Sequence, residues 1–278
     1  MTPGARLEAV IEILEKIWSG NQATDRLADM YFKKRRYAGS SDRRAIQATL
    51  YDILRRRSRL DWWIERSGLP LNSGPRSRTI TNLVLSEKVS PDEVSSLFNG
   101  LGHSPLELSE DEHRLIKELY GKALNHSEMP SAVALEYPNW MHASFLALWG
   151  GRLKTEISAL NQTAPVDIRV NTLRSTVAAV RTELESHSIE TSYTPLSPIG
   201  LRLISKARLG ETKAFRYGLI EVQDEGSQIL ALLCSAEPGM LVVDYCAGAG
   251  GKTLALAASM GSNGSIDGKL FACDISQS

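Results

Sequence analysis

The segment from Leu241 to Thr253, which reads LVVDYCAGAGGKT, constrains the fold of this chain most strongly. An apolar run ends at Asp244, a glycine-rich stretch follows, and apolar residues then recur at helical spacing from Leu254 to Met260. This order predicts a strand, a tight loop and a helix. Glycines let the backbone approach a ligand closely, and the first turn of a helix offers unpaired N–H groups. The segment is therefore a candidate loop for holding a nucleotide-like ligand.

Three loop patterns compete for this segment. A phosphate-binding P-loop needs a glycine where Cys246 stands, and a dinucleotide-binding loop needs one where Thr253 stands. The third pattern is an acidic residue followed by G-x-G, and Asp244, Gly248 and Gly250 match it. That pattern is typical of Rossmann-like methyltransferases that use S-adenosylmethionine. A glycine-rich turn without a ligand is the structural alternative.

A second predicted strand over residues 269–273 ends at Asp274. A carboxylate at the tip of the second strand of such a fold accepts hydrogen bonds from a ribose diol. We therefore expect Asp274 to face the ribose of the ligand.

Residues 218–228 read GLIEVQDEGSQ, and residues 244–253 read DYCAGAGGKT. These two motifs resemble the Fmu/Sun (RsmB-like) family of RNA cytosine-C5 methyltransferases. Segments 138–141, 159–161 and 168–173 follow in the family's order, and those around Asp42-Arg43-Arg44 and Leu54-Arg55-Arg56 resemble the NusB-like domain of its bacterial rRNA members. Within the glycine-rich loop, Gly248-Ala249 replaces the usual Ala-Pro, which removes a rigid φ angle.

The resemblance implies a multi-domain chain with S-adenosylmethionine as cofactor and RNA, in particular rRNA, as partner. Its parts would be an all-α NusB-like helical bundle over residues 1–135, a small α+β RRM-like module over 136–214, and the start of an α/β Rossmann-like methyltransferase domain over 215–278. The residues expected to bind the cofactor are Cys246, Ala247, Gly248, Ala249, Gly250, Gly251, Lys252 and Asp274.

Periodicity and capping signals support the helical part. Apolar residues between Leu7 and Trp18 keep helical spacing, and Ser41 is a candidate cap for the helix that follows. The segments Ser90–Glu93 and Ser109–Glu112 are capping boxes, in which the serine and the glutamate each bond to the other's backbone N–H. Trp62 and Trp63 are predicted to be packing residues, with base stacking as the alternative.

The middle of the chain predicts a strand over 167–171, a helix over 176–187 and two short strands within 192–204. Arg169 and Asn171 are candidate RNA contacts because a guanidinium fork and an amide can bind phosphates or base edges. The alternative is that both side chains hold a loop in place.

Net charge is zero, but the charges are unevenly distributed. Between Arg26 and Arg78 the chain has 14 Lys and Arg against 5 Asp and Glu. This excess predicts a surface for phosphate backbones, and the RNA contacts expected there are Lys33, Lys34, Arg35 and Arg36. A solvated helix surface would also account for these charges.

Methylation of cytosine at carbon 5 requires a cysteine thiolate that adds to C6, because C5 is not nucleophilic by itself. The three cysteines are Cys234, Cys246 and Cys273, and none matches the nucleophile of the family. Cys246 matches the family's loop cysteine, whereas Cys234 and Cys273 are predicted to be core residues. No catalytic residue is therefore assigned.

We expect the chain to be the N-terminal part of an enzyme whose catalytic cysteines follow Ser278, and to be inactive alone. A non-catalytic RNA-binding protein, comparable to NusB-type antitermination factors, is the alternative. Hydrophobic residues make up 42% of the chain, without a run near the ~20 residues of a membrane span. The cysteines show no metal-ligand spacing. We expect a cytoplasmic protein that binds neither membrane nor metal; the sequence indicates no oligomeric state.

Overall fold

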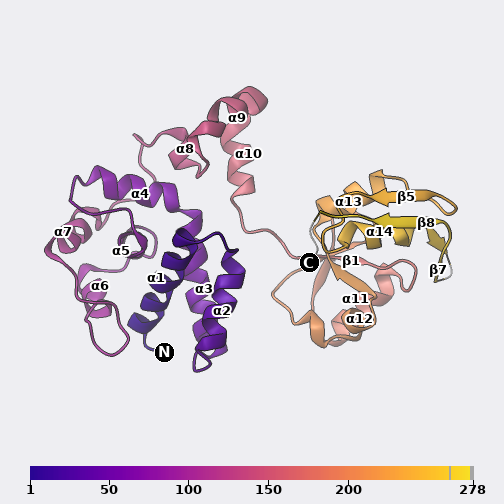
Figure 1. Cartoon of the computed structure of the whole chain (residues 1–278), viewed down its shortest axis with the longest axis horizontal. Helices are drawn as coiled ribbons and strands as arrows, with labels where there is room; N and C mark the ends of the chain where they lie inside the picture. The colour runs from indigo at the N-terminus through magenta and orange to yellow at the C-terminus, as the bar shows by residue number, and fades with distance from the viewer. Residues whose placement is uncertain (263, 276–278) are drawn as a thin grey trace. The chain divides into compact units, whose positions relative to one another are not determined.

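The computed structural model describes residues 1–262 and 264–275. The chain folds into two compact units, residues 1–162 and 163–278, each with its own core (Figure 1). The expected boundary at 135/136 lies inside the first unit, and the boundary at 214/215 lies inside the second. No helix among the described residues is both long and apolar enough to cross a bilayer.

The first unit is helical, as its periodicity predicts. Its main helices are α1 (Pro3–Ser19), α2 (Thr24–Lys34), α3 (Ser40–Arg55), α4 (Arg57–Arg66), α5 (Pro75–Leu85), α6 (Pro91–Leu97) and α7 (Glu110–Leu119). They are followed by α8 (Ser131–Ala134), η1 (Asn139–Met141), α9 (His142–Trp149), η2 (Gly150–Arg152) and α10 (Leu153–Leu160). Helix α5 is buried from Ser77 to Leu85 and packs against α1, α4 and α7, so it is the central helix of the bundle.

The predicted helix caps are confirmed at two of three sites. Ser90 and Ser109 both form reciprocal capping boxes, with Glu93 and Glu112 respectively. Ser41, however, does not cap α3. The N-cap is Gly39, whose N–H donates to Asp42 Oδ2 at 3.3 Å. The start of α3 is therefore stabilised by the carboxylate of Asp42, the third residue of the helix.

The two tryptophans of α4 pack inside the first unit, as predicted. Trp63 is 2% exposed, and its Nε1 donates to the Leu124 carbonyl at 2.9 Å. Trp62 lies edge-on against Trp63 and at 5.3 Å from the His126 ring.

The second unit contains a four-stranded antiparallel sheet in the order β2-β3-β1-β4. Its elements are β1 (Asp167–Val170), α11 (Val177–Ser186), β2 (Thr191–Tyr193), β3 (Gly200–Leu203), η3 (Leu209–Glu211), α12 (Lys213–Arg216) and β4 (Ile220–Val222). This βαββαβ order is that of a ferredoxin-like fold. The predicted strand–helix–strand–strand segment is confirmed. The fourth strand, β4, comes from the stretch that we had assigned to the methyltransferase domain.

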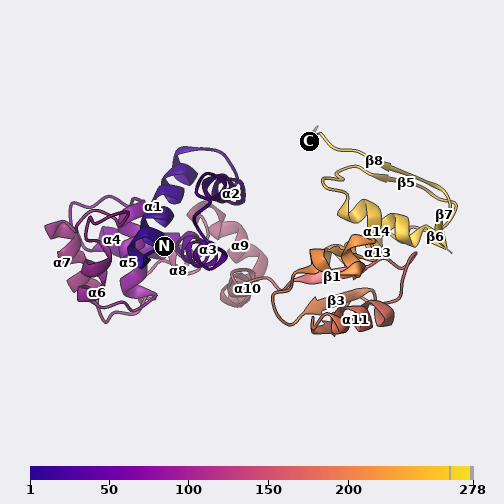
Figure 2. The ribbon, with the colours of Figure 1, turned by 90° about the horizontal axis from the view of Figure 1, so that it is seen from below.

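A second layer follows, formed by α13 (Glu225–Leu233), β5 (Leu241–Asp244), α14 (Gly251–Ser259), the short β6 (Gly261–Ser262) and β7 (Ser265–Ile266), and β8 (Lys269–Ala272). Strands β5 and β8 pair in parallel, which confirms the predicted strand–helix–strand unit. Figure 2 shows α13 and α14 between this pair and the four-stranded sheet, whose other face carries α11. One face of β5 and β8 packs on α14 through Val242 and Leu270.

Gly200 in β3 is required by close packing. An added Cβ would overlap Thr194 Oγ1 and lie 2.6 Å from Gln228 Oε1. We predict that Gly200→Ala destabilises the second unit by about 1–3 kcal/mol, because a buried polar contact must shift. Gly210→Ala is the matched control, since a Cβ there meets no atom within 4 Å.

The five tryptophans all lie in the first unit. Tryptophan fluorescence during urea unfolding should therefore report an unchanged first unit in both variants. Native-state hydrogen exchange should show faster exchange of β1 and β3 in Gly200→Ala only. Equal exchange rates in the two variants would contradict the packing argument.

Candidate functional site

The glycine-rich loop between β5 and α14 has a backbone that only glycine adopts readily at two positions. Gly248 has φ +53° and Gly250, the N-cap of α14, has φ +86°. The loop is held to the end of β8, because Ala247 N–H donates to the Cys273 carbonyl at 2.9 Å. The G-x-G spacing thus supports a turn that exposes backbone N–H groups at the start of α14.

Two carboxylates fix this loop. Asp244 Oδ2 accepts from the Thr253 hydroxyl at 2.6 Å, which joins the end of β5 to the first turn of α14. Asp274 Oδ2 accepts from Gly248 N–H at 2.8 Å. The residue expected to bind ribose therefore lies directly beside the glycine-rich loop, and Thr253 has a structural role where a dinucleotide loop has its third glycine.

A cavity of about 530 Å³ opens beside the loop. Six of the eight predicted cofactor residues line it, namely Cys246, Ala247, Gly248, Ala249, Gly251 and Lys252, whereas Gly250 and Asp274 are not among its lining residues. The remaining lining comes from Pro165, Val166, Asp167, Val222, Gln223, Asp224 and Ser227. The loop pattern alone does not predict these residues as part of the site. Val222, Gln223, Asp224 and Ser227 belong to the VQDEGS motif at residues 222–227, which in the sequence carries only the family resemblance.

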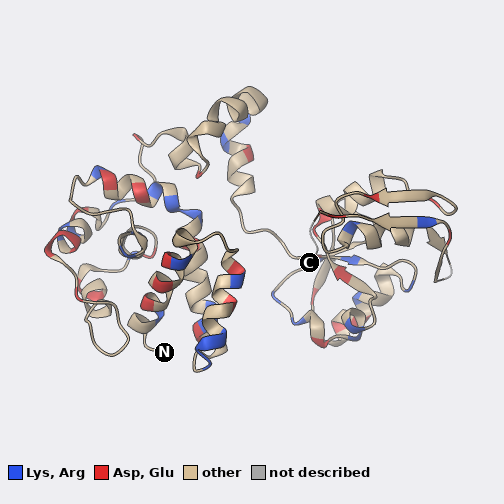
Figure 3. Ribbon diagram, viewed as in Figure 1, with Lys and Arg blue, Asp and Glu red and all other residues tan. Residues whose placement is uncertain are grey.

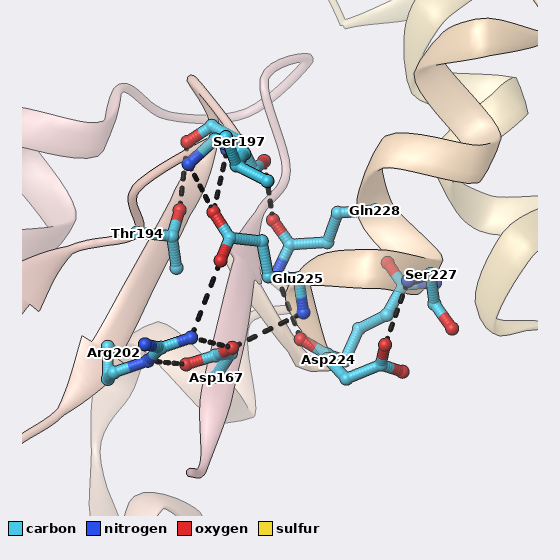
Figure 4. Close-up of polar contacts among 10 residues, drawn as sticks. Asp167, Thr194, Ser197, Arg202, Asp224, Glu225, Ser227 and Gln228 are labelled. Carbon is cyan, nitrogen blue, oxygen red and sulfur yellow. Dashed lines mark hydrogen bonds and ion pairs between the residues drawn. The ribbon is translucent and has the colours of Figure 1, made fainter. Parts of the chain in front are cut away.

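The side of the pocket formed by this motif is held by an ion network (Figure 4). Asp167 accepts two hydrogen bonds from Arg202, at 2.7 and 2.9 Å, and a third from Glu225 N–H at 3.3 Å. Glu225 in turn accepts from the backbone N–H groups of Leu196 and Ser197. The Asp167 carboxylate raises the pKa of Arg202, which stays charged.

The next residues of the motif cap and align α13. Asp224 accepts from Ser227 N–H at 2.8 Å as the N-cap of α13, and this bonding lowers the pKa of its carboxyl. Gln228 is fully buried and bonds through its two amide atoms to Ser197 Oγ and to the Gln223 carbonyl. The motif therefore builds a fixed wall for the cavity.

Arg169 and Asn171 do not lie on the surface that was expected to contact RNA. Arg169 is 1% exposed, and its Nε donates to Gln223 Oε1 at 2.8 Å. Among the residues that the structure describes, its Nη1 has no hydrogen-bond partner. Asn171 donates to the Gly218 carbonyl and accepts from Leu173 N–H, so it holds a loop in place. We therefore do not assign RNA contacts to these two side chains.

The basic stretch of the first unit is only partly available to a ligand. Seven of its 14 cations pair with carboxylates, including Arg56, Arg57 and Arg59. Arg35 pairs with Glu12 at 2.7 Å, and its guanidinium lies 3.9 Å from the centre of the Tyr31 ring.

Lys33, Lys34 and Arg36 are exposed and form no ion pair with any described residue. In the ribbon of Figure 3 the end of α2 is coloured blue for Lys and Arg. We call Lys33, Lys34 and Arg36 the α2 basic cluster.

The cysteines do not form a catalytic arrangement. All three are exposed, so the prediction that Cys234 and Cys273 are core residues was wrong. Cys234 is the C-cap of α13, and Cys273 follows β8 at the loop-facing end of the strand. Each apolar element is thus followed by an exposed cysteine.

Comparisons with known proteins agree with this arrangement. The ferredoxin-like domain of RsmF/B-like methyltransferases matches residues 137–209. A probable ribosomal RNA small subunit methyltransferase B from Synechocystis sp. is 28% identical over 245 residues, which cover 81% of this chain and 54% of that protein. The Pasteurella multocida ribosomal RNA small subunit methyltransferase B is 31% identical over 159 residues, 56% of this chain and 32% of that protein. The chain is therefore similar in sequence to ribosomal RNA small subunit methyltransferases B, and its residues 137–209 match the ferredoxin-like domain of RsmF/B-like methyltransferases.

A solved structure supports the fold independently. The crystal structure of PH0851 aligns with 100% of this chain and 64% of its own length, with a TM-score of 0.67 and 21% sequence identity. In the sequence comparison, the chain spans about half the length of the Synechocystis protein.

The cap of α13 gives a pH-dependent prediction. Asp224→Ala should destabilise the second unit by about 1 kcal/mol near neutral pH, the usual cost of losing an N-cap. Because the folded-state pKa of Asp224 is lowered, its contribution is present above the ordinary value of 3.8 and is lost as pH falls through the folded-state value. The difference between the parent and Asp224→Ala should therefore narrow in acid.

Asp224→Asn serves as the matched control for that prediction. An asparagine caps equally well but does not titrate. Its stability should equal that of the parent near neutral pH, as measured by hydrogen exchange of α13. If Asp224→Asn is as destabilised as Asp224→Ala, then the helix cap is not what Asp224 contributes.

Proposed function

We propose that this chain belongs to an S-adenosylmethionine-dependent rRNA cytosine-C5 methyltransferase, with a NusB-like helical part and the beginning of a Rossmann-like domain. The observation that carries the proposal is the cavity beside the Gly248–Gly250 loop, a loop whose Gly248 N–H is held by the Asp274 carboxylate. The relatives named as ribosomal RNA methyltransferases support the substrate class.

The loop and its cavity suit such a cofactor. The volume of about 530 Å³ lies within the range of small-molecule sites. The start of α14 offers N–H groups to the anionic end of the cofactor, and Lys252 adds a positive charge. The carboxylate of Asp274 can accept hydrogen bonds from the ribose hydroxyls of the cofactor. S-adenosylmethionine would supply the methyl group. The residues of this chain would bind and orient it.

The contribution of Asp274 can be measured directly. Asp274→Ala should weaken binding of S-adenosylmethionine by about 1.5–3 kcal/mol, the range for a hydrogen bond to a charged group. Calorimetry with this chain is the measurement, and Asp267→Ala is the control, because Asp267 is an exposed aspartate between β7 and β8. Unchanged affinity in Asp274→Ala would remove this residue from the proposed site.

The α2 basic cluster should supply a sequence-independent part of RNA binding. Replacing Lys33, Lys34 and Arg36 with glutamine should weaken binding to all RNAs alike. It should also reduce the slope of the logarithm of the binding constant against the logarithm of salt concentration by about 2, since fewer counterions are released. Fluorescence anisotropy over a salt series measures this. Arg35 is left intact because its charge is already paired.

A control variant with the same change of net charge distinguishes an effect of the α2 basic cluster on RNA binding from an effect of the overall charge. Lys154, Lys206 and Lys213 are exposed and scattered along the chain. Their replacement with glutamine should change the salt slope less than loss of the α2 basic cluster. Equal effects of the two triple variants would mean that the cluster is only a solvated surface.

The chain by itself should transfer no methyl group to rRNA. The thiol of Cys246 belongs to the cofactor loop, and neither Cys234 nor Cys273 lies in the cavity lining. A thiolate for addition to C6 is therefore missing from the site that these residues form. Transfer of labelled methyl groups from S-adenosylmethionine to rRNA by this polypeptide would contradict this prediction.

A second candidate function is RNA binding without catalysis. The exposed α2 basic cluster favours it, because this surface lies in the first unit, outside the loop cavity. RNA binding that survives Asp274→Ala, together with no measurable cofactor binding by the parent, would favour this alternative.

A further inference from the structure

Gln223 is a buried polar side chain in the wall of the loop cavity. It is 8% exposed, lines the cavity and follows the last residue of β4. The side chain comes close to the start of α14, because a Cβ on Gly251 would lie 3.5 Å from Gln223 Nε2. The position of this amide is therefore set against the glycine-rich loop itself.

Three of the four polar groups of Gln223 already form hydrogen bonds within the protein. Its backbone N–H donates to the Asp167 carbonyl at 3.1 Å, and its carbonyl accepts from Gln228 Nε2 at 2.9 Å. Its side-chain Oε1 accepts from Arg169 Nε at 2.8 Å. Only Nε2 remains, and within residues 1–262 and 264–275 no acceptor for its two hydrogens is found.

Arg169 decides which way this amide points. A guanidinium only donates, so the atom that faces Arg169 Nε has to be the oxygen of the amide. The reversed amide would set two donors against each other at a site where both side chains are buried, which is costly. The Nε2 hydrogens are consequently held on the side of Gly251 and the cavity.

The neighbours of Nε2 indicate what it would bind. Gly250 caps α14 without a side chain, so the first N–H groups of this nine-residue helix lack a side-chain acceptor. The adjacent Lys252 adds a positive charge to the same lining, in which the carboxylate of Asp167 is paired with Arg202 and that of Asp224 accepts from Ser227 N–H. Amide donors, a helix N-terminus and an ammonium together favour an anionic oxygen.

We propose that Gln223 is a ligand-binding residue of this cavity, donating from Nε2 to the carboxylate of an amino-acid moiety, and that Arg169 is the positioning residue that orients it. The inference rests on the proposed function, since S-adenosylmethionine carries such a carboxylate. It adds two residues that the loop pattern does not include.

The test compares two ligands that share the nucleoside and differ in the amino-acid end. S-adenosylhomocysteine and adenosine are each titrated into the ¹⁵N-labelled chain, and NMR follows the loop amides and the side-chain amide pair of Gln223. NMR detects weak binding as well as tight binding. S-adenosylhomocysteine should shift the Gln223 pair, whereas adenosine should shift Gly248 and leave that pair in place.

Variants of Gln223 test the donor. Gln223→Glu keeps an acceptor for Arg169 but loses the donor, so affinity for S-adenosylhomocysteine should fall by about tenfold. Adenosine affinity should change less than twofold. Gln47→Glu, in α3 of the first unit, is the control for the added charge.

Variants of Arg169 test the positioning role. Arg169→Lys can still donate to Oε1 and should bind both ligands nearly as the parent does. Arg169→Met should lose affinity for S-adenosylhomocysteine selectively. Loss of both ligands in equal measure, in a variant whose NMR spectrum shows a folded second unit, would mean that Arg169 only stabilises the unit and would overturn its positioning role.

The outcomes distinguish a failure of the Gln223 inference from a failure of the proposed cofactor site. If the loop amides shift but the Gln223 pair does not, or if Gln223→Glu weakens both ligands equally, then the inference is wrong and the cofactor site stands. If neither ligand shifts any loop amide, then both the inference and the cofactor site are overturned.

Discussion

The second unit depends on one buried carboxylate, that of Asp167. This residue is 3% exposed and lies where β1, β3 and α13 meet. Its two bonds to Arg202 and one from Glu225 N–H compensate the cost of removing its charge from water. Loss of one partner in such a pair leaves an uncompensated buried charge, typically at a cost of about 3–5 kcal/mol. The sheet, the turn before β3 and the start of α13 are therefore fixed together.

That constraint extends to the glycine-rich loop through the next hydrogen bonds. The Asp167 carbonyl holds Gln223, whose amide lies against Gly251 at the start of α14. The loop side of the cavity comes from the strand–helix unit, and the opposite wall comes from the ferredoxin-like sheet and the VQDEGS motif. The two motifs stand about twenty residues apart in the sequence, yet they line the same cavity, and the helices that follow them, α13 and α14, pack against each other.

The sequence predicted the elements whose signals are local. Capping boxes at Ser90 and Ser109, the strand–loop–helix at 241–260 and the strand ending before Asp274 needed only neighbouring residues. It missed β4, because a three-residue strand has too little periodicity to identify. The placement of Arg169 and the pairing of Arg35 with Glu12 depend on contacts between residues 54 and 23 positions apart, so the residue types alone could not reveal them. The charge count likewise overstated the free positive surface for this reason.

If the Gly248–Gly250 loop and the VQDEGS wall form one cofactor site, as we propose, then a ligand bound there should protect both segments. Hydrogen–deuterium exchange of the chain, with and without saturating S-adenosylhomocysteine, is the decisive measurement. We expect slower exchange in both segments 244–254 and 222–228, with no change in helices α1 to α7. Protection of neither segment, or protection confined to the helices of the first unit, would contradict it.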